Sequence, residues 1–371
     1  MPGLYIHIPF CRKKCNYCDF YSIAYKESLA SDYIDVLCGQ IKNLEGLSFS
    51  TIYIGGGTPS VLERMLLEKL LGSLERFIRC SQETTIEVNP ESLDLDKINL
   101  FKERGINRIS IGVQSFQGRI LEGLSRIHTP EESRRAISLS LKKFDNVNID
   151  LIFAVPGQST EDWLKDLEEA SKYKLTHISC YNLTYEEGTV IHRDLTLGRV
   201  KPVDNEEEAV MYQEAIKFLR DKGFVHYEIS NFAKEGFFCR HNLGYWQGEE
   251  FLGLGPTAGS FWRGKRLKNV SSVEDYIIKV KEGFMIEEEK PSSERLLREL
   301  LVLGLRKTQG VDFGSLYEKT GRHPQELLRP SLEKLVKDNF IEYIKNNTEI
   351  AGARLTPKGI LFFDDVASSL L

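Results

Sequence analysis

The sequence from residue 11 to residue 18 reads CRKKCNYC, which places Cys11, Cys15 and Cys18 within one short stretch. An apolar run at residues 4–8 precedes it and is closed by a proline, the pattern of a strand that feeds a loop. A tetrahedral zinc site needs four ligands, and the rest of the chain offers no partner CxxC or HxxxH pair. Three thiolates therefore suit a four-iron, four-sulfur cluster better, with one iron left open for a small molecule.

Length and composition limit the class of protein. The 371 residues suit one large α/β domain plus a smaller one, and the net charge of −5 argues against a general nucleic-acid binder. No apolar run approaches the roughly 18 residues of a membrane helix. The first strand begins almost at residue 1, so we expect no signal peptide and a cytoplasmic protein. The remaining cysteines are scattered, as in a reducing compartment, and we expect them to be small core residues: Cys38, Cys80, Cys180 and Cys239.

Short β-rich runs alternate with helical patterns along the first half of the chain. The expected strands are residues 4–8, 51–54, 84–88, 108–113, 147–153 and 177–181, separated by helices at 29–44, 65–78, 94–104, 131–144 and 160–173. This alternation implies parallel pairing with right-handed crossovers. Six units fall short of the eight that close a barrel. We therefore expect an α/β fold in which residues 1–230 form an open, three-quarter (β/α)6 barrel.

The second half of the chain follows a different pattern. We expect residues 231–290 to be an aromatic, Gly-rich connecting segment, with little regular structure at 237–262, a hairpin turning at Gly264 and a solvated acidic linker at 287–290. At residues 291–371, helical patterns precede two β-like runs, which predicts a smaller α+β, winged-helix-like domain. Such modules often bind DNA, but Lys and Glu are mixed here, so a protein-docking or lid role is expected and no nucleic acid.

Polar and glycine-rich segments follow the expected strands. GGGTPS occupies residues 55–60, Glu87 and Asn89 lie at the end of the third strand, Gln114 and Ser115 lie at the end of the fourth, and Asp150 lies within the fifth. Carboxyl ends of parallel strands meet at one rim, where polar groups are costly unless they are used. Each residue alone could be a hydrogen-bonded core polar group, but together with the cysteine loop they indicate a shared site. Alone the glycine run would predict a tight turn, but beside the three cysteines it indicates a close approach of the backbone to a ligand.

The motifs YIHIPFC with CxxxCxxC spacing, GGGTPS, IEVNPE and IGVQSF closely resemble those of the radical S-adenosylmethionine superfamily. The resemblance implies a [4Fe-4S] cluster on Cys11, Cys15 and Cys18, with S-adenosyl-L-methionine chelating the fourth iron. It also implies cofactor contacts at Tyr5, Tyr17, Gly56, Gly57, Thr58, Glu87, Gln114, Arg126 and Asp150. Arg126 has an alternative interpretation as an exposed arginine at a helix end.

Within the superfamily the chain resembles the oxygen-independent coproporphyrinogen III oxidase-like family. The oxidase itself has a further cysteine where this chain has Phe20, and a long N-terminal extension where this chain has four residues. Both departures point to the heme chaperone branch, which binds heme and passes it to an acceptor such as a respiratory hemoprotein. The resemblance also implies an electron donor such as flavodoxin or ferredoxin, and it assigns no catalytic residue. The alternatives are the radical decarboxylating oxidase and a structural cysteine site without catalysis.

The heme chaperone branch carries an HNxxYW motif, present here as His241, Asn242, Tyr245 and Trp246. Histidine is a common axial ligand of heme, and Trp and Tyr supply flat apolar surface against a macrocycle. These four residues are therefore heme candidates. In the alternative interpretation, His241 and Tyr245 lock this segment onto the barrel by hydrogen bonds. The other histidines of the expected strands, at positions 7 and 177, are expected in the core rather than as ligands.

Overall fold

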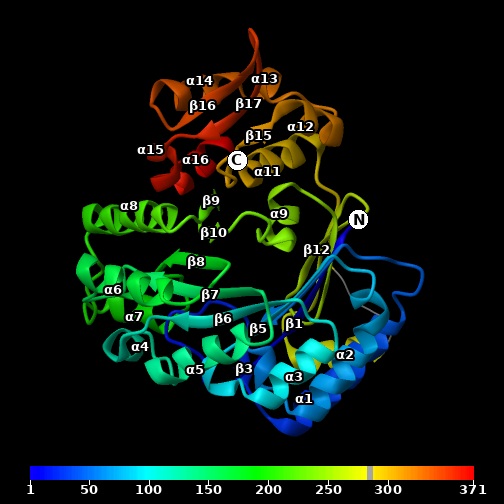
Figure 1. Cartoon of the computed structure of the whole chain (residues 1–371). Coiled ribbons are helices and arrows are strands. Elements are labelled where there is room, and N and C mark those ends of the chain that lie inside the picture. The colour runs from blue at the N-terminus through cyan, green and yellow to red at the C-terminus, as the bar shows by residue number, and fades with distance from the viewer. Residues whose placement is uncertain (282–286) are drawn as a thin grey trace.

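The computed structural model describes residues 1–281 and 287–371 (Figure 1). Within these residues one 12-stranded sheet has the order β14-β13-β12-β11-β1-β4-β5-β6-β7-β8-β10-β9. Its central strands pair in parallel: β1 (Gly3–Ile8), β4 (Thr51–Gly56), β5 (Glu83–Val88), β6 (Arg108–Gln114), β7 (Asn146–Phe153) and β8 (His177–Asn182). The two outermost strands do not pair with each other, so the sheet stays open. The predicted α/β fold with an open, six-unit barrel is confirmed.

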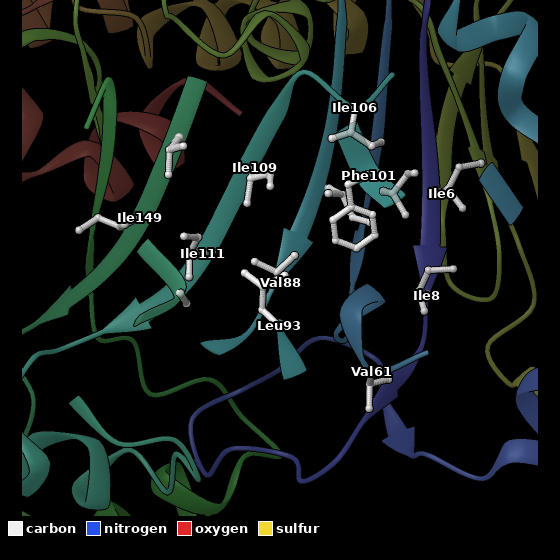
Figure 2. Packing of buried hydrophobic residues seen from close by; sticks show 14 of the residues in the cluster. Ile6, Ile8, Val61, Val88, Leu93, Phe101, Ile106, Ile109, Ile111 and Ile149 are labelled. Atoms are coloured by element: carbon white, nitrogen blue, oxygen red, sulfur yellow. The ribbon is translucent and has the colours of Figure 1, made fainter. Parts of the chain in front are cut away.

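Helices cross over between the parallel strands and cover the outer face of the sheet (Figure 1). They are α1 (Glu27–Lys42), α2 (Arg64–Ile78), α3 (Leu95–Glu103), α5 (Pro130–Leu141) and α6 (Thr160–Ser171), and α8 (Asn205–Asp221) follows the last parallel strand and packs beside α6. The side chains of β1 alternate, so that Ile6 and Ile8 face the helices while Tyr5 faces the barrel interior. Figure 2 shows these two isoleucines in one core with Ile109 of β6 and Phe101 of α3.

Short elements follow the carboxyl ends of the parallel strands. The cysteine loop is closed at its base by β2 (Phe10–Cys11) and β3 (Ile23–Ala24), which pair in parallel. The 3₁₀ turns η1 (Pro59–Val61) and η2 (Pro90–Ser92) follow β4 and β5, and α4 (Gly118–Gly123) and α7 (Val190–Thr196) follow β6 and β8. These elements build the rim on which the predicted cofactor residues stand.

The prediction of little regular structure at 237–262 was wrong. This part of the chain contains α9 (Arg240–Trp246), β11 (Phe251–Leu254) and β12 (Gly259–Trp262). Strand β11 pairs in parallel with β1, and Gly253 is needed there because a Cβ atom would lie 2.2 Å from the carbonyl oxygen of Gly259. Glycine therefore permits close strand contact in a region whose glycine content had indicated a loop.

The two sides of the sheet are extended by antiparallel strands. β10 (Asn231–Ala233) and β9 (Val225–Glu228) follow β8, while β12, β13 (Lys265–Lys268) and β14 (Glu287–Glu289) follow β11. The hairpin turn at Gly264 is confirmed. The acidic linker predicted at 287–290 is instead mostly strand, and an ion pair joins Lys265 to Glu288 across β13 and β14. Helix α10 (Val273–Lys281) precedes residues 282–286, which lie outside the described residues.

The C-terminal region folds around a core of its own. Helices α11 (Ser293–Leu305), α12 (Phe313–Thr320), α13 (Pro324–Leu327), α14 (Arg329–Lys337), α15 (Pro357–Leu361) and α16 (Phe363–Leu370) surround a sheet of β15 (Val311–Asp312), β17 (Glu349–Leu355) and β16 (Ile341–Asn346). This confirms the smaller α+β, winged-helix-like domain, in which Leu328 separates α13 from α14. The boundaries at residues 230 and 290 stay predictions.

Cys38, Cys180 and Cys239 are buried as predicted, but Cys80 is exposed. The prediction was wrong for Cys80 because it lies in the turn after α2, beyond the last residue that packs on the sheet. Among the described residues no helix combines the length and apolarity that crossing a membrane requires.

Candidate functional site

The cysteine loop lies at the carboxyl ends of the parallel strands. Cys11, Cys15 and Cys18 are all partly buried there, and burial raises the pKa of Cys18 to about 11. The Cys11 sulfur lies 3.5 Å from the Thr58 hydroxyl at the end of β4. Among the described residues no three His, Cys, Asp or Glu side chains converge closely enough to hold a single metal ion. In a four-iron cluster each thiolate binds a different iron, so its sulfurs need not meet at one point as zinc ligands do.

Arg126 joins the cysteine loop to two further strands. Its Nη1 atom donates to the Cys15 sulfur at 3.5 Å, and its Nη2 atom donates to Asn89 Oδ1 at 2.8 Å and to the carbonyl oxygen of Gly112 at 2.9 Å. Burial opposes ionisation of the guanidinium, but Tyr17 and Cys15 outweigh it, so the pKa of Arg126 is raised on balance. The alternative of an exposed arginine at a helix end does not fit these contacts. A fixed cation beside the thiols is a suitable partner for thiolate ligands.

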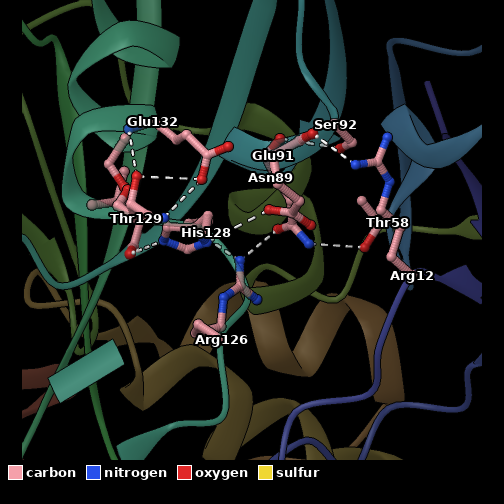
Figure 3. A network of polar contacts seen from close by, with 12 residues as sticks. Arg12, Thr58, Asn89, Glu91, Ser92, Arg126, His128, Thr129 and Glu132 are labelled. Atoms are coloured by element: carbon pink, nitrogen blue, oxygen red, sulfur yellow. Dashed lines mark hydrogen bonds and ion pairs between the residues drawn. The ribbon is translucent and has the colours of Figure 1, made fainter. Parts of the chain in front are cut away.

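Asn89 connects Thr58 and Arg126 on this rim through hydrogen bonds. Its Nδ2 atom donates to Thr58 Oγ1 at 3.0 Å while its Oδ1 atom accepts from Arg126, so one amide links β4, β5 and the segment after α4 (Figure 3). Asn89 was expected on this rim because it directly follows a buried strand, but it was not among the predicted cofactor contacts. Arg12 of the cysteine loop also reaches this region and donates to the carbonyl oxygen of Glu91 at 3.0 Å.

The glycine run at the end of β4 packs closely against the backbone that leads into the cysteine loop. Gly57 N donates to the carbonyl oxygen of Ile8 at 2.8 Å, and a Cβ atom on Gly57 would lie 2.7 Å from the carbonyl oxygen of Phe10. Gly56 has a positive φ of 110°, and its Cβ atom would meet the His7 ring at 2.5 Å. Close packing alone thus accounts for these glycines, as the tight-turn alternative expected. Their contact with a ligand stays a prediction.

Two carboxyl groups project into the barrel interior. Glu87 accepts from the Tyr53 hydroxyl at 2.6 Å and from Gly56 N at 3.1 Å, and burial raises its pKa to about 7. Asp150 accepts from Asn148 Nδ2 at 2.8 Å and from the Ser110 hydroxyl at 3.2 Å, and burial raises its pKa as well. Such acidic groups, held away from bulk water, form an environment suited to a cationic ligand.

The remaining predicted cofactor residues share this rim or the interior below it. The Tyr5 hydroxyl lies 3.0 Å from His7 Nδ1, whose ring also bonds the carbonyl oxygen of Tyr21, so this histidine is a hydrogen-bonded core residue. Tyr17 lies on the cysteine loop and packs on a small apolar cluster below it. Gln114 ends β6 with a positive φ of 65° and is buried. The structure therefore brings the nine predicted cofactor residues to the rim with the cysteine loop or to the barrel interior below it.

The HNxxYW residues lie at the opposite end. The carboxylate of Glu83 accepts from the backbone N–H groups of Arg240 and His241, both at 3.1 Å, and so caps the start of α9. His241 Nδ1 bonds the Thr51 hydroxyl at 2.8 Å, and His241 Nε2 bonds the Tyr245 hydroxyl at 2.8 Å. Thr51 and Glu83 are the first residues of β4 and β5. Helix α9 is therefore attached to the amino ends of the strands, far from the cysteine loop (Figure 1).

The surroundings of His241 match the alternative interpretation, in which His241 and Tyr245 attach this segment to the barrel by hydrogen bonds. Burial lowers the pKa of His241 to about 3, so the ring is neutral, and both nitrogens already have partners. Binding to iron would require one of these hydrogen bonds to break. Asn242 and Trp246 lie on the same helix, where Arg306 stacks 4.4 Å from the centroid of the Trp246 ring. A heme-ligand role for His241 stays a prediction, and the geometry does not favour it.

Comparisons with known proteins agree with the observed architecture. The family model of the Radical SAM superfamily matches residues 5–170, and that of the HemN C-terminal domain matches residues 292–362. Heme chaperone HemW of Lactococcus lactis is 36% identical over 344 residues, covering 92% of this chain and 88% of that protein. Heme chaperone HemW of Bacillus subtilis is 34% identical over 381 residues, covering 100% of this chain and 99% of that protein.

The structural comparison extends over the whole chain. The solved structure of the radical SAM enzyme coproporphyrinogen III oxidase (HemN) from Escherichia coli superposes with a TM-score of 0.83. The match covers 100% of this chain and 90% of the oxidase at 22% identity, and at that identity it shows the fold alone.

Proposed function

The chain belongs to the HemW family of radical S-adenosylmethionine proteins, and on that premise we propose that it is a heme chaperone. In this proposal it binds heme, a [4Fe-4S] cluster and S-adenosyl-L-methionine, and it transfers the heme to an acceptor hemoprotein. The observation that carries the proposal is its near full-length similarity to proteins named heme chaperone HemW. The cluster and S-adenosyl-L-methionine are implied by the superfamily, and the residues proposed to hold these two lie on the rim and in the adjoining barrel interior.

Cys11, Cys15 and Cys18 would hold three irons of the cluster. When bound, such a cluster supplies electrons one at a time to S-adenosyl-L-methionine. Arg126 places a positive charge beside Cys15, which would stabilise the thiolate form that binds iron. The contacts proposed for the cofactor are Tyr5, Tyr17, Gly56, Gly57, Thr58, Glu87, Gln114, Arg126 and Asp150. Of these, Glu87 and Asp150 would attract the positive charge of a sulfonium nucleotide.

The decarboxylating coproporphyrinogen III oxidase is not favoured as an alternative. At the position of that enzyme's additional cysteine this chain has Phe20, whose side chain is 64% exposed. Shared architecture with the oxidase cannot decide between the two functions, because one fold supports several chemistries.

The proposal includes partners at the cysteine loop and beyond. Arg12, Lys13 and Lys14 are exposed on this loop, although the chain as a whole carries a net charge of −5. A local positive patch would guide an acidic electron donor such as flavodoxin or ferredoxin toward the cluster. The acceptor of the heme would be a hemoprotein, for example a respiratory one, and we propose a cytoplasmic location for the exchange.

Anaerobic reconstitution followed by hemin titration tests the proposal. Wild type should retain iron and sulfide, show the electron spin resonance signal of a reduced [4Fe-4S] cluster, and bind hemin with a shifted Soret band. Cys15→Ala should lose the cluster, whereas Cys80→Ala, which changes an exposed cysteine far from the loop, should keep it. Hemin-loaded protein should pass its heme to an apo-hemoprotein. Absence of hemin binding, or vinyl formation from coproporphyrinogen III, would refute the chaperone function.

A further inference from the structure

A cavity of about 490 Å³ lies where α9, β11 and β12 meet helix α11 of the C-terminal domain. We call it the α9–α11 cavity. Its walls are mainly aromatic and aliphatic, with Tyr245, Trp246, Phe251, Phe261, Val302 and Leu303 among the lining residues. The volume lies within the range of small-molecule and cofactor pockets, and such walls suit a flat apolar ligand.

Polar groups of the cavity could orient an anionic ligand. The guanidinium of Arg266 lies 4.2 Å from the centroid of the Phe261 ring and donates to Glu299 at 2.9 Å. A guanidinium has five N–H donors, so this one retains donors for a second carboxylate. The indole N–H of Trp246 is buried, so Trp246 contributes its ring and not this donor to the cavity wall.

The cavity lacks the usual ligands of heme iron. Histidine, cysteine and methionine are absent from its described lining. Tyrosine can also ligate iron, but the Tyr245 hydroxyl is already bonded to His241 Nε2 at 2.8 Å. The cavity therefore offers a macrocycle apolar contact and a cation for a carboxylate, and no free axial ligand of these kinds.

The cavity is separated from the cysteine loop by the length of the barrel. Helix α9 is bonded to Thr51 and Glu83, the first residues of their strands, whereas Cys11 follows the last residue of β1. A strand of six residues is about 20 Å long. A ligand in the cavity thus cannot touch groups at the cysteine loop.

We propose that heme binds in the α9–α11 cavity through its macrocycle and a propionate group, and not through its iron. This rests on the proposed chaperone function. The macrocycle packs against Trp246 and Phe261, and a propionate pairs with Arg266. The iron stays open to an axial ligand supplied by the acceptor, which favours release by exchange. His241 is a positioning residue that ties α9 to Thr51 of β4 and bonds the Tyr245 hydroxyl on the same helix.

Titrations with hemin and with metal-free protoporphyrin IX test this proposal. In wild type the two affinities should agree within about threefold, because the iron contributes no protein bond. Val302→Trp, which fills the cavity, should weaken both by at least about tenfold, while Tyr317→Trp, a change at an exposed residue of the same domain, should weaken neither. Arg266→Gln should weaken both by about tenfold, and Arg263→Gln, in the exposed turn of the same hairpin, should not.

The outcomes distinguish the site from the function. Wild-type hemin affinity in Val302→Trp or in Arg266→Gln would overturn the site and leave the chaperone function intact. A wild type that binds hemin about a hundredfold more tightly than protoporphyrin IX would show iron ligation and overturn the proposal. A wild type that binds neither refutes both the site and the function. If circular dichroism shows Val302→Trp to be unfolded, two other results test the site. These are the comparison of Arg266→Gln with Arg263→Gln and the ratio of the hemin affinity to the protoporphyrin IX affinity in wild type.

Discussion

Replacing Glu87 with glutamine would test whether the barrel interior holds a carboxyl group that resists ionisation. Burial is the largest cause that raises the pKa of Glu87 from 4.5 to about 7, and nearby Asp150 adds to it. The folded chain therefore binds this proton more tightly than the unfolded chain does. The resulting contribution to the free energy of unfolding is fully present below pH 4.5 and is lost as the pH rises through 7. At about 1.4 kcal/mol per pKa unit the loss approaches about 3 kcal/mol, an upper value because the group is partly solvated.

Glutamine cannot ionise, so the comparison with wild type isolates this loss. Between pH 5 and pH 8 we expect the free energy of unfolding of Glu87→Gln to gain about 2 kcal/mol relative to wild type. Changed hydrogen bonds to Tyr53 and Gly56 shift the difference by the same amount at every pH and do not affect its slope. Urea unfolding of the cofactor-free chain at pH 5, 6, 7 and 8 measures it, with the exposed Glu318→Gln variant as the matched control. A difference that stays flat over this range would refute the raised pKa.

Three further substitutions test contacts at the two ends of the barrel, the one with the cysteine loop and the one with α9. Arg126→Gln should lower the iron retained per chain after anaerobic reconstitution and cost about 2 kcal/mol of stability, because it removes the cation beside the cysteine loop; wild-type iron content would contradict this. Gly57→Ala should lower the free energy of unfolding by about 1–3 kcal/mol, since its Cβ atom would meet the Phe10 carbonyl oxygen at 2.7 Å. The control Gly39→Ala, in α1 with no atom within 4 Å of the new Cβ, should be neutral or stabilising by up to about 1 kcal/mol, and equal urea midpoints for both would count against the packing argument. His241→Ala should lose about 2–4 kcal/mol of stability yet keep hemin affinity within about threefold, whereas a large loss of affinity at unchanged stability would make it a ligand.

The parallel sheet could be predicted because its signals are local. Buried residues such as Ile6 and Ile109 lie in short apolar runs, and helices of regular length separate those runs. The rim could be predicted for the same reason, since polar residues directly follow buried strands. Each strand end contributes its own residues, and parallel pairing then brings these together without further information.

The parts that could not be predicted depend on contacts distant in sequence. Strand β11 is short and contains Gly253. It forms a strand because it pairs with one edge of β1, which is distant in the sequence. Asn89 was expected on the rim, but its hydrogen bonds to Thr58 and Arg126 could not be predicted from local patterns. The sequence also did not indicate that HNxxYW and the cysteine loop lie at opposite ends, because spacing along the chain does not encode the direction in which a helix attaches to a barrel.

The pairing of β1 with β11 has a consequence for the newly made chain. Leu4 pairs with Ile52 on one side and with Leu252 on the other. One edge of β1 therefore stays unpaired until β11, roughly 250 residues later in the sequence, has been synthesised. At about 5–20 residues per second, translation leaves that edge unpaired for on the order of 10–50 s. An open apolar strand edge invites pairing with other chains. Released fragments that end before Phe251 should therefore associate with one another, and fragments that extend past Leu254 should associate less.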